Sequence, residues 1–335
     1  MAKISVFGAG TWGLGISILL HNNGHSVTVW SAVPAEIEML RKTKEHKNLP
    51  GVKMPEGLCF TDDLEEATRE ADLMVLSVAS VYTRATARRM KPYIKEGQII
   101  VNVAKGIEEG TLATLRDQIA EEIPQADVAV LSGPSHAEEV SRGIPTTCVA
   151  GATTQKTAET IQNIFMSPVF RVYTSPDVLG IELGGALKNV IALAAGIADG
   201  LGYGDNTKAA LITRGMTEIV RLGIAMGAKV ETLYGLSGIG DLIVTCASMH
   251  SRNRRAGILM GKGYTMEEAM KEVKMVVEGV YSAKAARALA EKYQVTMPIV
   301  EQVNQILFEG KPAAQAVEDL MLRDKRIEHP SLPWE

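Results

Sequence analysis

The sequence predicts an α/β protein in which a doubly wound sheet is followed by an all-α C-terminal domain. Up to about residue 175, short β-rich runs alternate with helical stretches, as expected for a sheet with helices on both faces. After Ser175-Pro176, strand-like runs largely disappear and Ala, Leu, Met and Glu recur at helical spacing. A chain of 335 residues also exceeds most single cores. We therefore expect two domains, residues 1–177 and 178–335.

The first predicted strand, Ile4–Phe7, leads directly into a glycine-rich turn. In this G-x-G-x-x-G pattern, Gly8 allows a tight turn and Gly10 lets the backbone approach a pyrophosphate, while Gly13 lets helix and strand pack closely. A second predicted strand over 27–30 completes a βαβ unit of about 30 residues. The sequence therefore predicts a Rossmann-type dinucleotide site, with the phosphates at the N-terminus of the first helix.

Later elements follow the same logic. Apolar runs predict strands over 73–78, 99–103, 128–131, 146–150 and 169–173, the last two as edge strands whose direction stays open. Helical periodicity predicts helices over 180–199, 206–227, 251–262, 281–294, 297–308 and 312–322. Helix starts are indicated by Asp62 or Asp63, Thr111, Asn206-Thr207 and Pro298.

Composition favours a cytoplasmic enzyme acting on a small molecule. The net charge of −4 gives no reason to expect nucleic acid or an anionic membrane as partner. The three cysteines are widely spaced without a CxxC pair, which indicates reduced thiols. No uninterrupted apolar run approaches ~18 residues, and a first strand near Lys3 leaves no room for a leader peptide. Histidine and cysteine spacing predicts no metal site.

Lys188 stands out in the C-terminal half. It lies in the apolar helical stretch Gly184–Leu193, where its neighbours on the same helix face cannot pair with its charge. Glycines one turn earlier leave room for a ligand, and apolar flanks would desolvate the ammonium and lower its pKa. Such a lysine can donate and accept a proton near neutral pH. The alternative is an ordinary lysine that extends to the surface.

The stretch Ser251–Asn253 combines groups that bind phosphate. Ser251 is placed to cap a helix, and Arg252 and Asn253 fall in its first turn. Helix N–H groups, a guanidinium and an amide together suit a phosphate. A solvated basic face is the alternative, because two more arginines follow directly.

Loop residues beyond two predicted strands extend this site. Lys105 follows the strand over 99–103, and Gly133 and Ser135 follow the next one. Ligands of open α/β sheets bind beyond the carboxyl ends of the strands, where these residues lie. Asp241, in a glycine-rich apolar stretch, is expected to cap a helix or to orient a lysine or a substrate hydroxyl.

Taken together, several motifs carry a family resemblance. They are GAGTWG at 8–13, AKGIE at 104–108, GPSHAEEV at 133–140, ELGGALKN at 182–189, YGDNTKAALITRG at 203–215, GIGDL at 238–242, SRNRRAG at 251–257 and VEG at 277–279. Over essentially its whole length the chain resembles the NAD(P)-dependent glycerol-3-phosphate dehydrogenases of the bacterial soluble type. The resemblance implies reversible reduction of dihydroxyacetone phosphate to sn-glycerol 3-phosphate, a precursor for phospholipid synthesis. It also implies a homodimer.

The resemblance also implies a role for individual residues. Lys188 would be the general acid and base at the C2 oxygen. Substrate contacts would come from Lys105, Gly133, Ser135, Lys188, Asp241, Ser251, Arg252 and Asn253. Cofactor contacts would come from Gly8, Gly10, Thr11, Trp12, Gly13, Lys105, Ala137, Arg252, Val276 and Glu278.

The choice between NAD and NADP stays open. After the strand over 27–30 the family often has an arginine suited to the 2′-phosphate of NADP. This chain has Ser31-Ala32, with neither that arginine nor the acidic residue that selects NAD. The nearest cations, Arg41, Lys42 and Lys44, are expected on the following helix. The sequence leaves open whether their side chains reach the 2′-phosphate position.

Two other functions are compatible with the fold. One is a reductase of another small substrate such as a β-hydroxyacid. The phosphate-binding stretch 251–253 is the feature that favours the glycerol-3-phosphate dehydrogenase hypothesis over this one. The other is a non-enzymatic dinucleotide sensor, against which Lys188, Lys105 and Asp241 argue.

Overall fold

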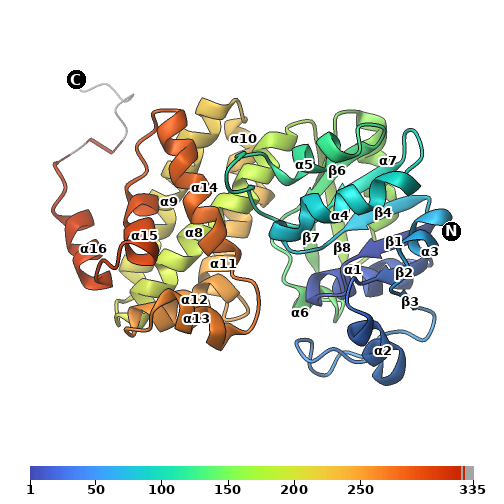
Figure 1. The fold of residues 1–335 in the computed structure, drawn as a ribbon. Coiled ribbons are helices and arrows are strands. Elements are labelled where there is room, and N and C mark those ends of the chain that lie inside the picture. Colours follow the sequence, from blue (N-terminus) through green and yellow to red (C-terminus); the bar gives the residue numbers. More distant parts are fainter. Residues whose placement is uncertain (326, 329–335) are drawn as a thin grey trace.

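The computed structural model describes residues 1–325, 327 and 328. An α/β half formed by the N-terminal residues lies beside a helical half formed by the C-terminal residues (Figure 1). This confirms the predicted fold class. The predicted domain boundary between residues 177 and 178 stays a prediction. Residues 326 and 329–335 of the second predicted domain lie outside the described residues.

One eight-stranded sheet forms the α/β half, in the order β3-β2-β1-β4-β5-β6-β7-β8. Its strands are β1 Lys3–Phe7, β2 Ser26–Trp30, β3 Cys59–Thr61, β4 Leu73–Leu76, β5 Ile99–Asn102, β6 Asp127–Ser132, β7 Thr146–Gly151 and β8 Phe170–Ser175. All neighbours pair in parallel except β6 and β7. The two late strands, β7 and β8, therefore both run antiparallel to β6. Of these two, β8 lies at the edge of the sheet as predicted, whereas β7 lies between β6 and β8. The sequence analysis missed β3, which has three residues.

Helices cover both faces of the sheet. They are α1 Thr11–Asn22, α2 Pro34–Thr43, α3 Leu64–Arg69, α4 Thr83–Met90, α5 Leu115–Glu122, α6 Ala137–Val140 and α7 Gln155–Phe165. The buried side chains of α1, α2, α6 and α7 pack in one cluster with the sheet, and those of α3, α4 and α5 in another. Asp63 caps α3 as predicted. The predicted start at Thr111 is wrong, because Leu112 has a left-handed φ of 63° and Thr114 caps α5 instead.

The helical half is built around a single long helix. Its helices are α8 Val178–Gly200, α9 Asp205–Met226, α10 Val230–Leu233, α11 Asp241–Ala247, α12 Arg252–Gly261, α13 Met266–Val273, α14 Glu278–Lys292, α15 Pro298–Phe308 and α16 Ala313–Met321. Predicted starts at Ser251 and Pro298 are confirmed. The predicted cap at Asn206-Thr207 is wrong, because α9 already begins at Asp205 and its N-cap residue is Gly204.

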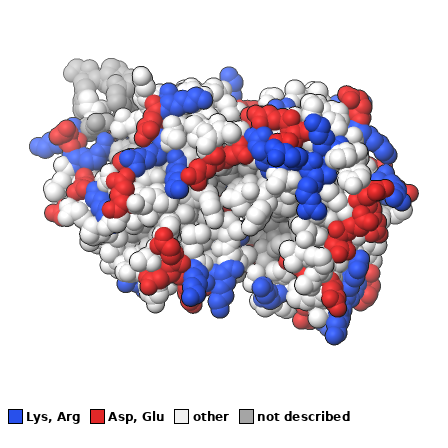
Figure 2. All heavy atoms as spheres, viewed as in Figure 1, with Lys and Arg blue, Asp and Glu red and all other residues white. Residues whose placement is uncertain are grey.

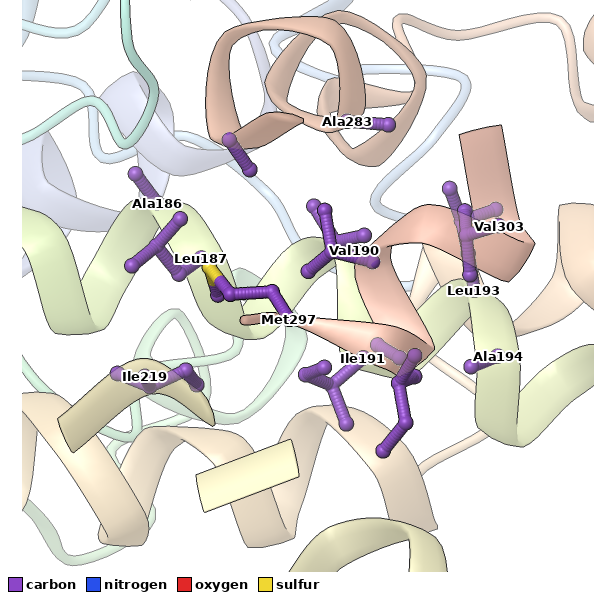
Figure 3. Close-up of a cluster of buried hydrophobic side chains, with 14 of the residues drawn as sticks. Ala186, Leu187, Val190, Ile191, Leu193, Ala194, Ile219, Ala283, Met297 and Val303 are labelled. Atoms are coloured by element: carbon purple, nitrogen blue, oxygen red, sulfur yellow. The ribbon is translucent and has the colours of Figure 1, made fainter. Parts of the chain in front are cut away.

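Helix α8 is the core of the helical half. Its side chains, among them Leu187, Val190 and Ile191, pack against residues of α9, α14 and α15 (Figure 3). Among the described residues, α8 is the one unbroken helix long and apolar enough to cross a membrane, but 83% of its apolar window is buried in the protein. Burial of this kind is typical of a core helix enclosed on all sides.

Helices α8 and α12 touch through their backbones. A Cβ added at Gly196 of α8 would lie 2.1 Å from the carbonyl oxygen of Arg254 in α12. Conversely, a Cβ added at Gly257 of α12 would lie 2.3 Å from the carbonyl oxygen of Leu193 in α8. Glycine at these positions therefore lets the two helices approach more closely than side chains would allow.

We expect Gly13→Ala to destabilise the α/β half. A Cβ at this position would lie 1.9 Å from the carbonyl oxygen of Gly8, so the β1–α1 turn must shift. Overpacking of this kind costs about 1–3 kcal/mol, which thermal unfolding would detect as a lower Tm. Gly10→Ala is the matched control, because its Cβ would meet nothing within 4 Å and its φ is −67°. Equal melting of the two variants would contradict this account of the turn.

Charged side chains of both signs are interspersed over the face shown in Figure 2. This agrees with the small net charge of −4. For example, Arg84 of α4 pairs with Glu121 and Glu122 of α5 and with Glu108 in the segment before α5.

Candidate active site

A cavity of about 390 Å3 lies between the two halves, within the ~300–1,000 Å3 typical of small-molecule sites. It is lined by twelve of the predicted site residues, namely Gly10, Thr11, Trp12, Lys105, Ser135, Ala137, Lys188, Ser251, Arg252, Asn253, Val276 and Glu278. Four others, Gly8, Gly13, Gly133 and Asp241, do not line it. The structure thus brings residues from both halves of the chain to one cavity.

Lys188, Asp241 and Lys105 form a buried ionic cluster. The Asp241 carboxylate accepts hydrogen bonds from Lys188 through Oδ1 and from Lys105 through Oδ2, the second at 2.6 Å. Lys188 also donates to the Thr245 hydroxyl at 2.7 Å. Lys188 is 5% exposed and Asp241 is 1% exposed. The expectation that Lys188 has no partner on its own helix face holds, but Asp241, at the start of α11, supplies one across the helix interface.

Burial and charge move the pKa values in this cluster in defined directions. Burial lowers the pKa of Lys188 to about 8, with Asp241 opposing the shift and Lys105 adding to it. Burial alone would raise the pKa of Asp241, but the ammonium groups of Lys105 and Lys188 outweigh it and lower that pKa. Asp241 is therefore ionised at neutral pH, and Lys188 changes protonation state close to neutral pH. A lysine that changes protonation state near neutral pH is suited to proton transfer.

The backbone carbonyl of Gly133 holds two polar side chains of the cavity wall in place. It accepts hydrogen bonds from Lys105 Nζ at 3.0 Å and from Ser135 Oγ at 2.9 Å. Gly133 has a φ of +147°, and a Cβ there would lie 3.0 Å from the Cα of Cys148. Gly133 therefore acts through its carbonyl oxygen, which positions the two side chains that line the cavity.

At the N-terminus of α12, Arg252 is the group without a protein partner. It lines the cavity, and within the described part of the chain its guanidinium makes no hydrogen bond or ion pair. Burial lowers its pKa, with Glu278 and Glu138 opposing. Ser251 caps the helix by accepting a hydrogen bond from the backbone N–H of Arg254. A half-buried guanidinium without a partner among the described residues, beside a helix N-terminus, favours an anionic ligand.

Asn253 has a more structural position than the sequence suggests. Its amide donates to the Asn189 side-chain oxygen at 2.9 Å, and its own oxygen accepts from the Gly279 backbone N–H at 2.8 Å. Asn253 thereby joins α12 to α8 and α14. One amide hydrogen of Asn253 remains for a ligand in the cavity.

The residues at the start of α1 fit a dinucleotide phosphate. Gly10 is the N-cap of α1 without a side-chain cap, and a Cβ there would meet open space. The first-turn N–H groups are therefore free for an anion. Trp12 donates from Nε1 to the Val103 carbonyl at 3.1 Å, which fixes its ring in the cavity wall. These features meet the requirements for the pyrophosphate of a dinucleotide.

Glu278 closes the cavity from the helical half. Its carboxylate accepts from the Ser80 backbone N–H at 3.1 Å and from the Ser80 hydroxyl. Burial raises the pKa of Glu278, and the hydrogen bonds from Ser80 oppose that shift. This contact joins the loop after β4 to the start of α14.

Some residues of the site were missed because they need the folded chain to be recognised. Thr245 lies one turn after Asp241, and the i, i+4 spacing was the available signal. Asn189 and Ser80 had no distinguishing pattern. His136 lines the cavity, and its buried Nε2 has no hydrogen-bond partner in the described structure. No group of three or more His, Cys, Asp or Glu among the described residues could hold a metal ion.

Comparison with known proteins identifies close relatives over the whole length. Residues 3–158 match the family model described as the N-terminus of NAD-dependent glycerol-3-phosphate dehydrogenase, and residues 177–318 match the C-terminus. Glycerol-3-phosphate dehydrogenase [NAD(P)+] of Agathobacter rectalis is 68% identical over 335 residues, covering 100% of both chains. The Fusobacterium nucleatum protein of the same name is 61% identical, covering 98% of this chain and 99% of its own.

A solved structure agrees. The crystal structure of glycerol-3-phosphate dehydrogenase from Coxiella burnetii superposes with a TM-score of 0.93 at 36% identity. The match covers 96% of this chain and 99% of the other. Sequence and fold therefore point to the same relatives.

Proposed function

This chain belongs to the NAD-dependent glycerol-3-phosphate dehydrogenase family, and we infer that it reversibly reduces dihydroxyacetone phosphate to sn-glycerol 3-phosphate with NAD(P)H, for phospholipid synthesis. One observation carries this function beyond the family assignment. A lysine able to transfer a proton and an unpaired arginine at a helix N-terminus line the same cavity. These are the groups that a phosphorylated ketone requires. A dinucleotide sensor requires no proton donor, and the family assignment favours a phosphorylated ketone over a β-hydroxyacid.

In the proposed reaction Lys188 moves the proton. The nicotinamide, when bound, supplies the hydride that reduces C2. Protonated Lys188 donates its proton to the C2 oxygen as negative charge develops there. Asp241 holds the ammonium in place, and Lys105 adds positive charge beside the developing oxyanion. In the reverse direction neutral Lys188 takes the proton from the hydroxyl.

Arg252 and the N-terminus of α12 bind the phosphate in this proposal. The guanidinium offers two parallel N–H donors, and the first-turn N–H groups add further ones. Substrate contacts are assigned to Lys105, Ser135, Lys188, Ser251, Arg252 and Asn253, with Gly133 and Asp241 positioning them. Cofactor contacts are assigned to Gly10, Thr11, Trp12, Lys105, Ala137, Arg252, Val276 and Glu278, with Gly8 and Gly13 shaping the turn that presents them.

The direct test is oxidation of NADH and NADPH, followed by absorbance, with dihydroxyacetone phosphate or unphosphorylated dihydroxyacetone. Efficient turnover confined to the phosphate ester is the expected result. Dinucleotide binding without any turnover would favour the sensor, and equal use of both ketones would remove the phosphate assignment.

We expect Asp241→Asn and Lys105→Met to move the pH profile in opposite directions. Loss of the Asp241 charge destabilises protonated Lys188 and lowers its pKa below about 8, whereas loss of the Lys105 charge raises it. Reduction needs protonated Lys188, so its rate falls as pH rises through that pKa. The alkaline limb of kcat/KM for ketone reduction should therefore shift down in the first variant and up in the second. Shifts of the same sign would contradict the electrostatic account.

Three further assignments remain proposals. We place the domain boundary at 177/178, between the end of β8 at Ser175 and the start of α8 at Val178. We propose a homodimer, which sedimentation would test. We also propose a cytoplasmic location, supported by three cysteines that are all free thiols.

A further inference from the structure

The two residues that directly follow β2 are not acidic, but the carboxylate of Glu36, five residues further along the chain, lies beside the first of them. Ser31 directly follows β2, and its hydroxyl donates to Glu36 Oε2 at 2.6 Å. The same hydroxyl oxygen accepts from the Val33 backbone N–H at 3.2 Å. Glu36 lies in the first turn of α2. Its side chain therefore reaches back over the turn to the position just beyond the second strand.

Glu36 is held there as an anion. His46 Nε2 lies 3.8 Å from Glu36 Oε1, and the Glu36 side chain keeps 27% of its surface exposed. The neighbouring His46 ring is the main cause that lowers the pKa of Glu36, and the hydrogen bond from the Ser31 hydroxyl adds to it against the effect of burial. The exposed fraction leaves room for a further partner, since a carboxylate offers about four acceptor sites.

Three cations near the end of β2 contact other groups, whereas Lys42 and Lys47 are exposed. Arg41 donates two hydrogen bonds to the Phe60 carbonyl, at 3.0 and 2.6 Å. Lys44 lies over the Phe60 ring, and Arg89 lies over the Trp30 ring at 5.3 Å from its centroid. Lys47 is exposed, and its charge has the smallest influence among those that lower the pKa of Glu36. The position beyond β2 therefore presents a fixed negative charge.

Resting on the proposed dinucleotide use, we propose that Glu36, positioned by Ser31, makes this enzyme select NAD(H) over NADP(H). In doubly wound sheets the ribose of the adenosine lies beyond the second strand, where an acidic side chain accepts a hydrogen bond from its 2′-hydroxyl. A 2′-phosphate at the same place would bring two negative charges to the carboxylate. Glu36 supplies from helix α2 the acid that Ser31-Ala32 lack.

Binding measured by calorimetry, without ketone substrate, tests this selection. Wild-type protein is expected to bind NADH at least about tenfold more tightly than NADPH, the scale of one charge-assisted hydrogen bond. Glu36→Gln keeps the size of the side chain and one acceptor oxygen for Ser31 but removes the charge, and should reduce the NADH preference by about tenfold. Glu38→Gln, an exposed glutamate on the same helix, is the matched control for net charge and should leave the preference unchanged.

Several outcomes would overturn the proposal. They are equal wild-type affinity for the two dinucleotides, an unchanged preference in Glu36→Gln, or an equal change in Glu38→Gln. Selective loss of NADPH binding in Lys47→Ala would also overturn it, because a cation would then recognise the 2′-phosphate. If neither dinucleotide binds, the proposed function itself fails, which separates the two hypotheses.

Discussion

Replacing Lys188 with alanine is expected to lower kcat for dihydroxyacetone phosphate reduction by about 10²–10⁴-fold, the usual contribution of a general acid. The lysine lies in the cavity wall, and Asp241 would keep Lys105 as its partner in the variant. The carboxylate would therefore remain paired, and the loss would report on proton transfer. Steady-state kinetics with saturating NADH would measure it.

The control for this variant is Lys262→Ala, which removes an exposed lysine from the same helical half. It should turn over like the wild type. NADH binding by Lys188→Ala should also stay near wild-type affinity, because Lys188 is assigned to the substrate. Turnover of Lys188→Ala within about tenfold of wild type would fall below the usual range for a general acid and rule out the proposed mechanism.

Arg252→Ala is expected to lower kcat/KM for dihydroxyacetone phosphate by about 10²-fold. The lost interaction is the proposed charge-assisted, bidentate contact to phosphate in the cavity, of about 1.5–3 kcal/mol. Activity with unphosphorylated dihydroxyacetone should barely change, since that ketone offers nothing for the guanidinium to bind. Arg252→Lys should recover part of the loss, because it restores the charge without the planar fork.

A separate measurement distinguishes the phosphate from the cofactor. Arg252 is assigned to both ligands, so NADH affinity of Arg252→Ala must be determined alongside the kinetics. A proportional loss with both ketones would mean that Arg252 serves the cofactor alone.

The sequence contained enough information for the fold class and for much of the cavity wall. Gly8 and Gly13 have local causes, because the turn before α1 requires glycine at both positions, and Gly10 leaves open space at the helix N-terminus. Lys188 was recognisable since an isolated charge in an apolar helix must find a partner or a function. Such features depend on neighbours within a few residues.

Other features depend on residues that meet only after folding. The partner of Lys188 comes from α11, 53 residues away in sequence. Strand β3 is too short for an alternating pattern, and the cap of α5 shifted to Thr114 because of one left-handed residue. Glu36 was overlooked because its carboxylate reaches a position five residues earlier.

The glycine contact between α8 and α12 has a consequence for substrate choice. Helix α8 carries Lys188 and helix α12 begins at Arg252, and the two backbones touch. The backbone positions that carry the proton donor and the guanidinium are thus held at a fixed separation. In the proposed site, this separation limits the distance between the carbonyl and the phosphate of a substrate that contacts both Lys188 and Arg252. We expect a ketone with one more carbon between its carbonyl and its phosphate to make only one of these two proposed contacts well.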